Sequence, residues 1–269
     1  MRVSLESFTR CCVLLFTGLA ASCSLHALPD PLITDAAELL PRISAPLDDT
    51  FLAEARIEYY GDGQARKGKL TILAEPPERI RLDVLSFTDD LISLMAIEEG
   101  HFTYFERGRK ECFTGPMCAA PVVAAFPMVN EPGYLLNILV GRIPLLPFPE
   151  SESVTFSRRQ GVYVYVRTDS AGRRQEIHVR PDGLAVAEAI LEESGKTVLR
   201  VSFEGLIESG DRSVPRTIRL VSPLKKLDLS VEYREVELGY KPTGNPFSYT
   251  CPEGTETHSL QCQEVDSHE

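Results

Sequence analysis

The stretch Leu227-Asp228-Leu229-Ser230-Val231-Glu232-Tyr233-Arg234 decides the fold, because apolar and polar side chains alternate along most of it. Successive side chains of a β-strand point to opposite faces, so this period of two is typical of a strand with one buried face. The same alternation recurs from residue 51 onward, in segments 56–59, 69–72, 79–84, 162–166, 176–179 and 216–220. Turns rich in Gly, Pro, Asp and Ser separate these segments. About ten strands at this spacing predict a mainly β protein with a large, curved antiparallel sheet.

Two apolar segments interrupt the strands in the middle of the chain. Residues 119–126 are rich in helix formers, and residues 134–140 make a second helical segment that Gly141 would end. A helix that is apolar all round has to be buried or to cover an apolar surface. We therefore expect both helices to lie across the concave face of the sheet. A third, short helix is expected to start near Thr34 or Asp35.

A curved sheet under apolar helices has two interpretations. It is either a container for a ligand the size of a lipid or a filled core that the helices complete. The alternation does not say which face is concave, so both interpretations remain open.

The N-terminus has the order of an export signal. Arg2 and Arg10 precede an apolar run over residues 11–21, which is too short to cross a bilayer as a helix of about 20 residues. Small residues follow this run. The sequence therefore predicts that residues 1–22 are removed on export.

The stretch Leu19-Ala20-Ala21-Ser22-Cys23 resembles a bacterial lipobox. In that motif a thiol follows the cleavage site, because the sulfur is the nucleophile that takes up the lipid. Cys23 is therefore the predicted lipidation site, carrying acyl chains such as palmitate. The alternative is an ordinary secretory signal that is cut near Ala21 or Ala27.

The charge balance limits the partners of the mature chain. The full chain has a formal net charge of −11, and the predicted leader removes a net positive charge from it. An acidic surface disfavours binding to nucleic acid and electrostatic attraction to anionic lipid head groups. Attachment to a membrane is therefore expected through acyl chains, which contribute about 0.8 kcal/mol per buried CH₂.

Four cysteines remain in the predicted domain, namely Cys112, Cys118, Cys251 and Cys262. Export favours disulfides, and four thiols allow three pairings. The expected pairing is the local one, Cys112–Cys118 with Cys251–Cys262, because each pair closes a short loop. No spacing of Cys and His is typical of a metal site, and no cofactor is expected.

Three stretches, taken in order, resemble the LolA/LolB lipoprotein-carrier superfamily. The first is a strand at 68–72 followed by 77–83, which reads Pro-Glu-Arg-Ile-Arg-Leu-Asp. The second is the helix 135–140 with a Gly-x-x-Pro end at Pro144. The third runs from Pro215 through the strand at 227 to the Phe247–Pro252 end. Because Cys23 is a predicted lipidation site, the sequence resembles LolB more than LolA.

The resemblance covers roughly residues 36–252 and implies an open, unclosed antiparallel β-barrel of about eleven strands with helices covering the concave face. It also implies acyl-chain binding and an outer-membrane location, and Ser24 after Cys23 fits outer-membrane sorting. The expected organisation is a lipoprotein signal peptide at 1–22 and a tether at 23–34. A half-barrel domain follows at 35–250, and a disulfide-closed tail at 251–269 ends the chain.

The resemblance also directs attention to particular residues. The expected lining of an acyl-chain cavity is Ile57, Leu70, Ile72, Ile80, Leu82, Leu135 and Leu139. LolB-like receptors present an apolar residue in the loop after the Arg-rich strand, and the matching loop here contains Phe87 and then Leu91. Phe87 would then contact a membrane or a partner protein, although a lone aromatic residue is more often part of a core.

The sequence contains no G-x-S-x-G, H-E-x-x-H or Gly-rich phosphate loop. Neighbouring carboxylates such as Asp89-Asp90 and Glu192-Glu193 point to opposite faces of a strand or into solvent. His101 and His178 have no evident catalytic partner. We therefore expect a binding protein and no enzyme, with a structural subunit of an envelope complex as the alternative.

Overall fold

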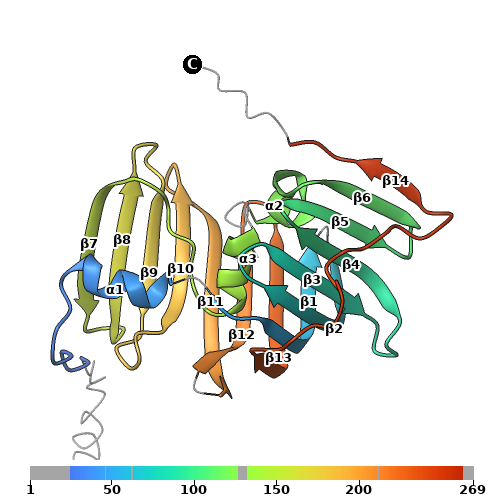
Figure 1. The fold of residues 1–269 in the computed structure, drawn as a ribbon. Helices are drawn as coiled ribbons and strands as arrows, with labels where there is room; N and C mark the ends of the chain where they lie inside the picture. Colours follow the sequence, from blue (N-terminus) through green and yellow to red (C-terminus); the bar gives the residue numbers. More distant parts are fainter. Residues whose placement is uncertain (1–24, 46, 62, 127–131, 211, 263–269) are drawn as a thin grey trace, which may run out of the picture.

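The computed structural model describes residues 25–45, 47–61, 63–126, 132–210 and 212–262, and these form one twisted sheet with short helices (Figure 1). Fourteen strands lie in the order β14-β6-β5-β4-β3-β2-β1-β13-β12-β11-β10-β9-β8-β7. The terminal strands β14 and β7 do not pair, so the sheet is an unclosed barrel. The predicted fold class is confirmed, with fourteen strands where about eleven were expected.

Most strands follow one another as antiparallel neighbours. Their bounds are β1 Phe51–Gly61, β2 Gln64–Glu75, β3 Arg79–Leu85, β4 Leu91–Glu98, β5 His101–Glu106, β6 Glu111–Pro116, β7 Pro149–Ser157, β8 Val162–Asp169, β9 Arg174–Val179, β10 Val186–Glu193, β11 Lys196–Ser209, β12 Arg212–Ser222, β13 Leu227–Leu238 and β14 Glu256–Ser259. Strand β1 pairs with both β2 and β13, which joins the two halves of the chain in the middle of the sheet. Among the described strands, only β14 pairs in parallel, with β6.

Three α-helices and one turn of 3₁₀ helix accompany the described strands. They are α1 Ala36–Ile43, η1 Met117–Ala119, α2 Pro121–Ala125 and α3 Pro132–Leu139. The Asp35 carboxylate caps α1 by accepting the N–H of Ala37 at 2.9 Å. Gly141 follows α3 with a φ of +82°, a conformation that favours glycine and ends the helix. All three predicted helices are therefore present.

The helices lie on one face of the sheet, called the inner face below. Helix α1 crosses β7 to β9 and α3 lies over the middle of the sheet (Figure 1). Side chains of the three helices belong to the same buried cluster as the inward residues of the strands. Tyr233 of β13 donates a hydrogen bond from its hydroxyl to the carbonyl of Leu139 at 2.8 Å, which fixes the end of α3.

The connection from α3 to β7 also crosses the inner face. Gln175 of β9 is fully buried, and its amide donates to the Pro144 carbonyl at 2.7 Å and accepts the N–H of Leu146 at 3.0 Å. Both backbone groups would otherwise lose hydrogen bonds on burial. One side chain therefore holds an irregular segment against the sheet.

The first described residues, which the sequence assigned to a tether, lie along β7 and β8. The N–H of His26 donates to the carbonyl of Arg158 at 2.8 Å. Ile33 is buried, and its N–H donates to the Tyr163 hydroxyl at 3.3 Å. The chain therefore contacts the sheet from residue 26 onward.

A second apolar cluster lies on the opposite, outer face of β2 to β6, and we call it the outer-face cluster. Its members are Leu73, Leu94, Ala96, Phe105, Cys112 and Phe247, none more than 8% exposed. Residues paired across strands share a face, and the pairs Leu94↔Phe105 and Phe105↔Cys112 align three of them.

Residues 240–262, the C-terminal strap, cover this cluster. Arg81 donates to the carbonyl of Pro246 at 2.9 Å, and Asn245 donates to Glu98 at 3.1 Å. The Tyr249 ring lies 6.0 Å from the Phe105 ring. The strap then adds β14 to the edge of β6, which protects an otherwise open sheet edge.

The predicted local disulfides are wrong. The structure joins Cys112 to Cys251 and Cys118 to Cys262, across 139 and 144 residues. At about 3.3 Å per residue, the extended strand β6 carries the chain more than 10 Å from Cys112 before Cys118, beyond the reach of a disulfide. The strap runs beside β6, so its two cysteines meet one partner each.

Candidate functional site

The inner face gathers the residues predicted to line an acyl-chain cavity. Five of them are buried and two are half-buried against the same cluster. The buried ones are Leu70, Ile72, Ile80, Leu135 and Leu139; the half-buried ones are Ile57 and Leu82. Cross-strand pairs such as Ile72↔Leu82 explain why alternation brings them to one face. Their role as a lipid lining stays a prediction.

Helices α2 and α3 form the cover over this apolar face. Helix α2 has 5 residues and α3 has 8, and α3 buries Leu135, Leu136, Ile138 and Leu139. Isolated helices shorter than about 12 residues are marginal in water, so packing on the sheet holds these helices in place. An acyl chain would enter the inner face only by displacing part of this packing.

The inner face of β8 carries polar side chains that sequence reasoning missed. In the stretch Val162-Tyr163-Val164-Tyr165-Val166 the tyrosines point inward and are buried. Burial, together with a hydrogen bond to Glu152, raises the pKa of Tyr165. Arg167 follows on the same face, 7% exposed and 3.5 Å from Glu152. The valines and the tyrosines of this strand are both residue types that tolerate burial. The alternation therefore did not indicate which of the two faces inward.

The loop between β3 and β4 presents Phe87 to solvent, with 61% of the residue exposed. Ser86 holds the loop, because its hydroxyl accepts the N–H groups of Thr88 and Asp90, each at 3.1 Å. Asp89, which has a φ of +65°, pairs with Lys69 at 2.6 Å. Phe87 therefore stands out on a loop whose own backbone is hydrogen-bonded.

Leu91 begins β4 and is half-buried, so the structure separates it from the exposed tip. A depression of about 280 Å³ lies beside Phe87 and is also lined by Leu70 and Leu85. Of the seven predicted lining residues, Leu70 is the only one that borders this depression.

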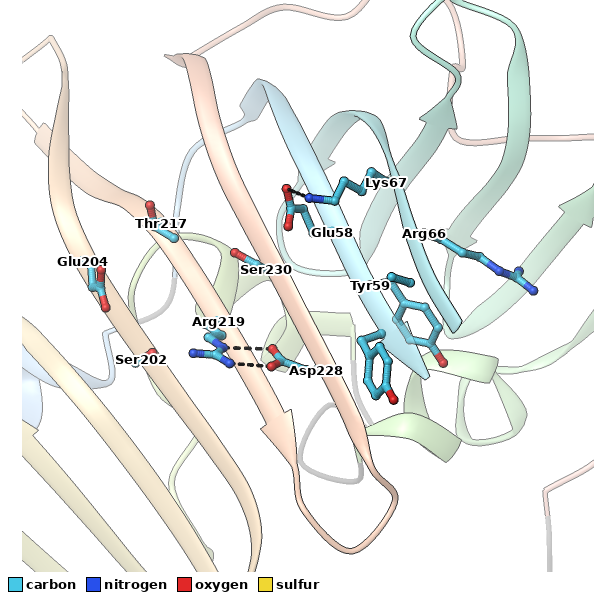
Figure 2. A pocket seen from close by; sticks show the side chains of 12 residues that line it. Glu58, Tyr59, Arg66, Lys67, Ser202, Glu204, Thr217, Arg219, Asp228 and Ser230 are labelled. Atoms are coloured by element: carbon cyan, nitrogen blue, oxygen red, sulfur yellow. Dashed lines mark hydrogen bonds and ion pairs between the residues drawn. The ribbon is translucent and has the colours of Figure 1, made fainter. Parts of the chain in front are cut away.

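The largest of the described pockets, about 400 Å³, lies on the outer face of β1, β2 and β11 to β13 (Figure 2). Its charged groups face one another: Arg219 bonds Asp228 at 2.9 Å and Lys67 bonds Glu58 at 2.8 Å. The hydrogen bond from Arg219 lowers the pKa of Asp228. The lining contains neither His nor Cys.

The described residues hold neither a candidate metal site nor a membrane-spanning helix. They contain no group of three or more His, Cys, Asp or Glu side chains placed to hold a metal ion. His178 lies 2.6 Å from Glu176 and 3.6 Å from Glu188, and His101 is exposed. No described helix is long and apolar enough to cross a bilayer.

Fold and site together define a helix-covered, unclosed β half-barrel with an apolar inner face. No family model matches the chain, and no curated protein matches it. Solved structures are similar. A LolA superfamily protein from Nitrosomonas europaea is 14% identical with a TM-score of 0.49, covering 76% of this chain and 92% of that chain. A putative outer membrane lipoprotein-sorting protein domain from Vibrio parahaemolyticus is 10% identical with a TM-score of 0.45, covering 79% and 94%.

A DUF1329 family protein from Desulfovibrio piger is 11% identical with a TM-score of 0.45, covering 75% of this chain and 89% of that chain. None of the three separates a LolB-like protein from a LolA-like one.

Proposed function

We propose that this protein binds acyl chains between α3 and the inner face of its half-barrel. The observation that carries the proposal is the cover itself: short, almost wholly apolar helices lie on an apolar sheet that does not close. Displacing such helices costs packing but leaves the strand pairing intact. The binding would need no covalent chemistry, so the proposed activity is binding and transfer of a lipid or of lipoprotein acyl chains.

We further propose that Cys23 anchors the protein in the cell envelope of a Gram-negative bacterium, at the outer membrane and facing the periplasm. Cys23 lies outside the described residues. Two disulfides support an oxidising compartment. The contact of His26 with Arg158 would place the anchor near the turn between β7 and β8.

Phe87 is the proposed point of contact with a membrane or an envelope protein. Its exposure and its hydrogen-bonded loop support this role.

Acyl-chain binding is tested with a photoactivatable fatty acid and the mature chain from residue 23 carrying Cys23→Ser. Native mass spectrometry should show one bound fatty acid, and peptide mapping should place the label on α3 or near Ile57 and Leu82. Ile92, which is 41% exposed, serves as the surface reference. The proposal would be contradicted if no fatty acid is bound, or if the label is spread over surface sites such as Ile92.

The second candidate is a non-catalytic accessory or assembly subunit with a filled core. The packing favours it, since the predicted lining residues are buried against one another and against the helices. Phe87 would then be a protein interface. Full protection of α3 amides from hydrogen exchange, unchanged by added fatty acid, would favour this candidate.

A further inference from the structure

A pocket of about 170 Å³ lies where the C-terminal ends of α1 and α3 meet the turn between β9 and β10. Three arginines line it, namely Arg42 in the last turn of α1, Arg142 after α3 and Arg180 after β9. The backbone joins the two helix ends here, because the N–H of Ile143 donates to the carbonyl of Ile43 at 3.2 Å. The three positive charges are therefore held by fixed backbone elements.

Two of these guanidinium groups donate hydrogen bonds to carbonyl oxygens. Arg180 donates to the carbonyls of Val186 at 3.3 Å and Phe203 at 2.6 Å, and Arg142 donates to the carbonyl of Arg42. Carbonyl groups orient a guanidinium but do not neutralise its charge. Within the described ranges, none of the three arginines forms an ion pair with a carboxylate.

The charges also act on one another. Burial lowers the pKa of Arg142, and the nearby charges of Arg212 and Arg42 lower it further. Arg212 itself pairs with Asp48 at 2.9 Å. The chain holds 39 acidic against 28 basic side chains. In such an acidic chain an arginine is expected to pair with a carboxylate, yet these three have no such partner among the described residues. An anion from outside would relieve the repulsion.

The rest of the lining mixes apolar side chains with glycines and Ser213. Val140, Val186, Phe203 and Pro215 are buried, and Leu206 at the rim is 51% exposed. Val140 and Phe203 also belong to the cluster on the inner face. The pocket therefore brings three cationic side chains together with apolar ones, as a ligand with an anionic head and an apolar body requires.

We propose that Arg42, Arg142 and Arg180 form a binding site for a phosphate group, borne by an amphiphile whose apolar part lies on the apolar side chains of this pocket. The planar guanidinium fork matches phosphate oxygens in pairs. The site goes beyond acyl-chain binding in the core and does not depend on it, because the pocket exists with the helices in place.

Calorimetric titration of the mature chain carrying Cys23→Ser tests the proposal with two probes, inorganic phosphate and dihexanoyl phosphatidic acid. Both should bind saturably if the pocket takes free phosphate. Only the second should bind if the apolar side chains are needed. Arg42→Gln should weaken the binding roughly tenfold, as expected for one lost charged hydrogen bond. Arg42 is exposed and its side chain makes no described hydrogen bond, so this variant should fold.

Arg159→Gln is the matched control, since it removes the same charge from an exposed position outside the pocket. The proposal fails if neither probe binds, or if the control weakens binding as much as Arg42→Gln does. Uptake of decanol, an uncharged chain, should be equal in both variants. Failure of decanol uptake alone would count against acyl-chain binding and leave the phosphate site standing.

Discussion

The outer-face cluster predicts a large loss of stability for Phe247→Ala. Phe247 is 1% exposed, and the Arg79 guanidinium lies 5.2 Å from its ring centroid. Returning the atoms of a buried Phe side chain to water costs about 1.5–3 kcal/mol. The cavity left under the strap raises the expected loss to about 3–5 kcal/mol. Arg79 is 38% exposed and is paired with Glu75, so its contact with the ring adds at most about 1 kcal/mol.

Urea denaturation followed by far-UV circular dichroism measures this loss, because the chain has no tryptophan to report by fluorescence. The melting temperature should fall by about 10 °C, at about 2–4 °C per kcal/mol for a chain of this size. Phe148→Ala is the control: Phe148 is 91% exposed, and its replacement should change stability by less than about 0.5 kcal/mol. Equal losses in the two variants would show that the strap is not packed on the sheet.

Three further changes have defined outcomes. Cys251→Ala should increase the fluorescence of the dye ANS and lower the free energy of unfolding, measured in urea, by about 3 kcal/mol. The loss is no larger because the second disulfide, Cys118–Cys262, remains and keeps the loop that is freed short. Tyr233→Phe should cost about 1–3 kcal/mol in the same assay, because it leaves the buried carbonyl of Leu139 without its donor. Asp228 has a pKa lowered from 3.8 by Arg219, so its contribution to stability is present above that pH and is lost as the pH falls below it. Asp228→Asn should therefore flatten the decline of stability in acid, and an unchanged slope would contradict the assignment.

The period of two in the sequence predicted most of the fold correctly, because alternation is a local property of a strand. Residues 227–234 lie within β13, and Asp35 caps α1 as its position implied. The shift from alternation to continuous apolar residues located α2 and α3. The same rule did not identify the inner face of β8, since Val and Tyr are both tolerated in a core.

Features that join distant parts of the chain were not predictable in this way. The sequence pattern says nothing of the parallel pairing between β14 and β6, and without it the local disulfides were the reasonable expectation. Arg42, Arg142 and Arg180 are separated by 100 and 38 residues, and only the crossing of two helix ends with a turn brings them together. A site whose residues come from three separate elements has no sequence motif of fixed spacing by which it could be predicted.

The two apolar faces of the sheet differ in how they are covered, and this difference locates the proposed function. The outer face is covered by a strap that two disulfides tie to β6 and η1. Opening it would break covalent bonds. The inner face is covered by helices of 5 and 8 residues, whose described contacts with the sheet are apolar packing and single hydrogen bonds such as that from Tyr233. Since noncovalent contacts of this size exchange readily and disulfides do not, a ligand that enters the protein would enter at the inner face.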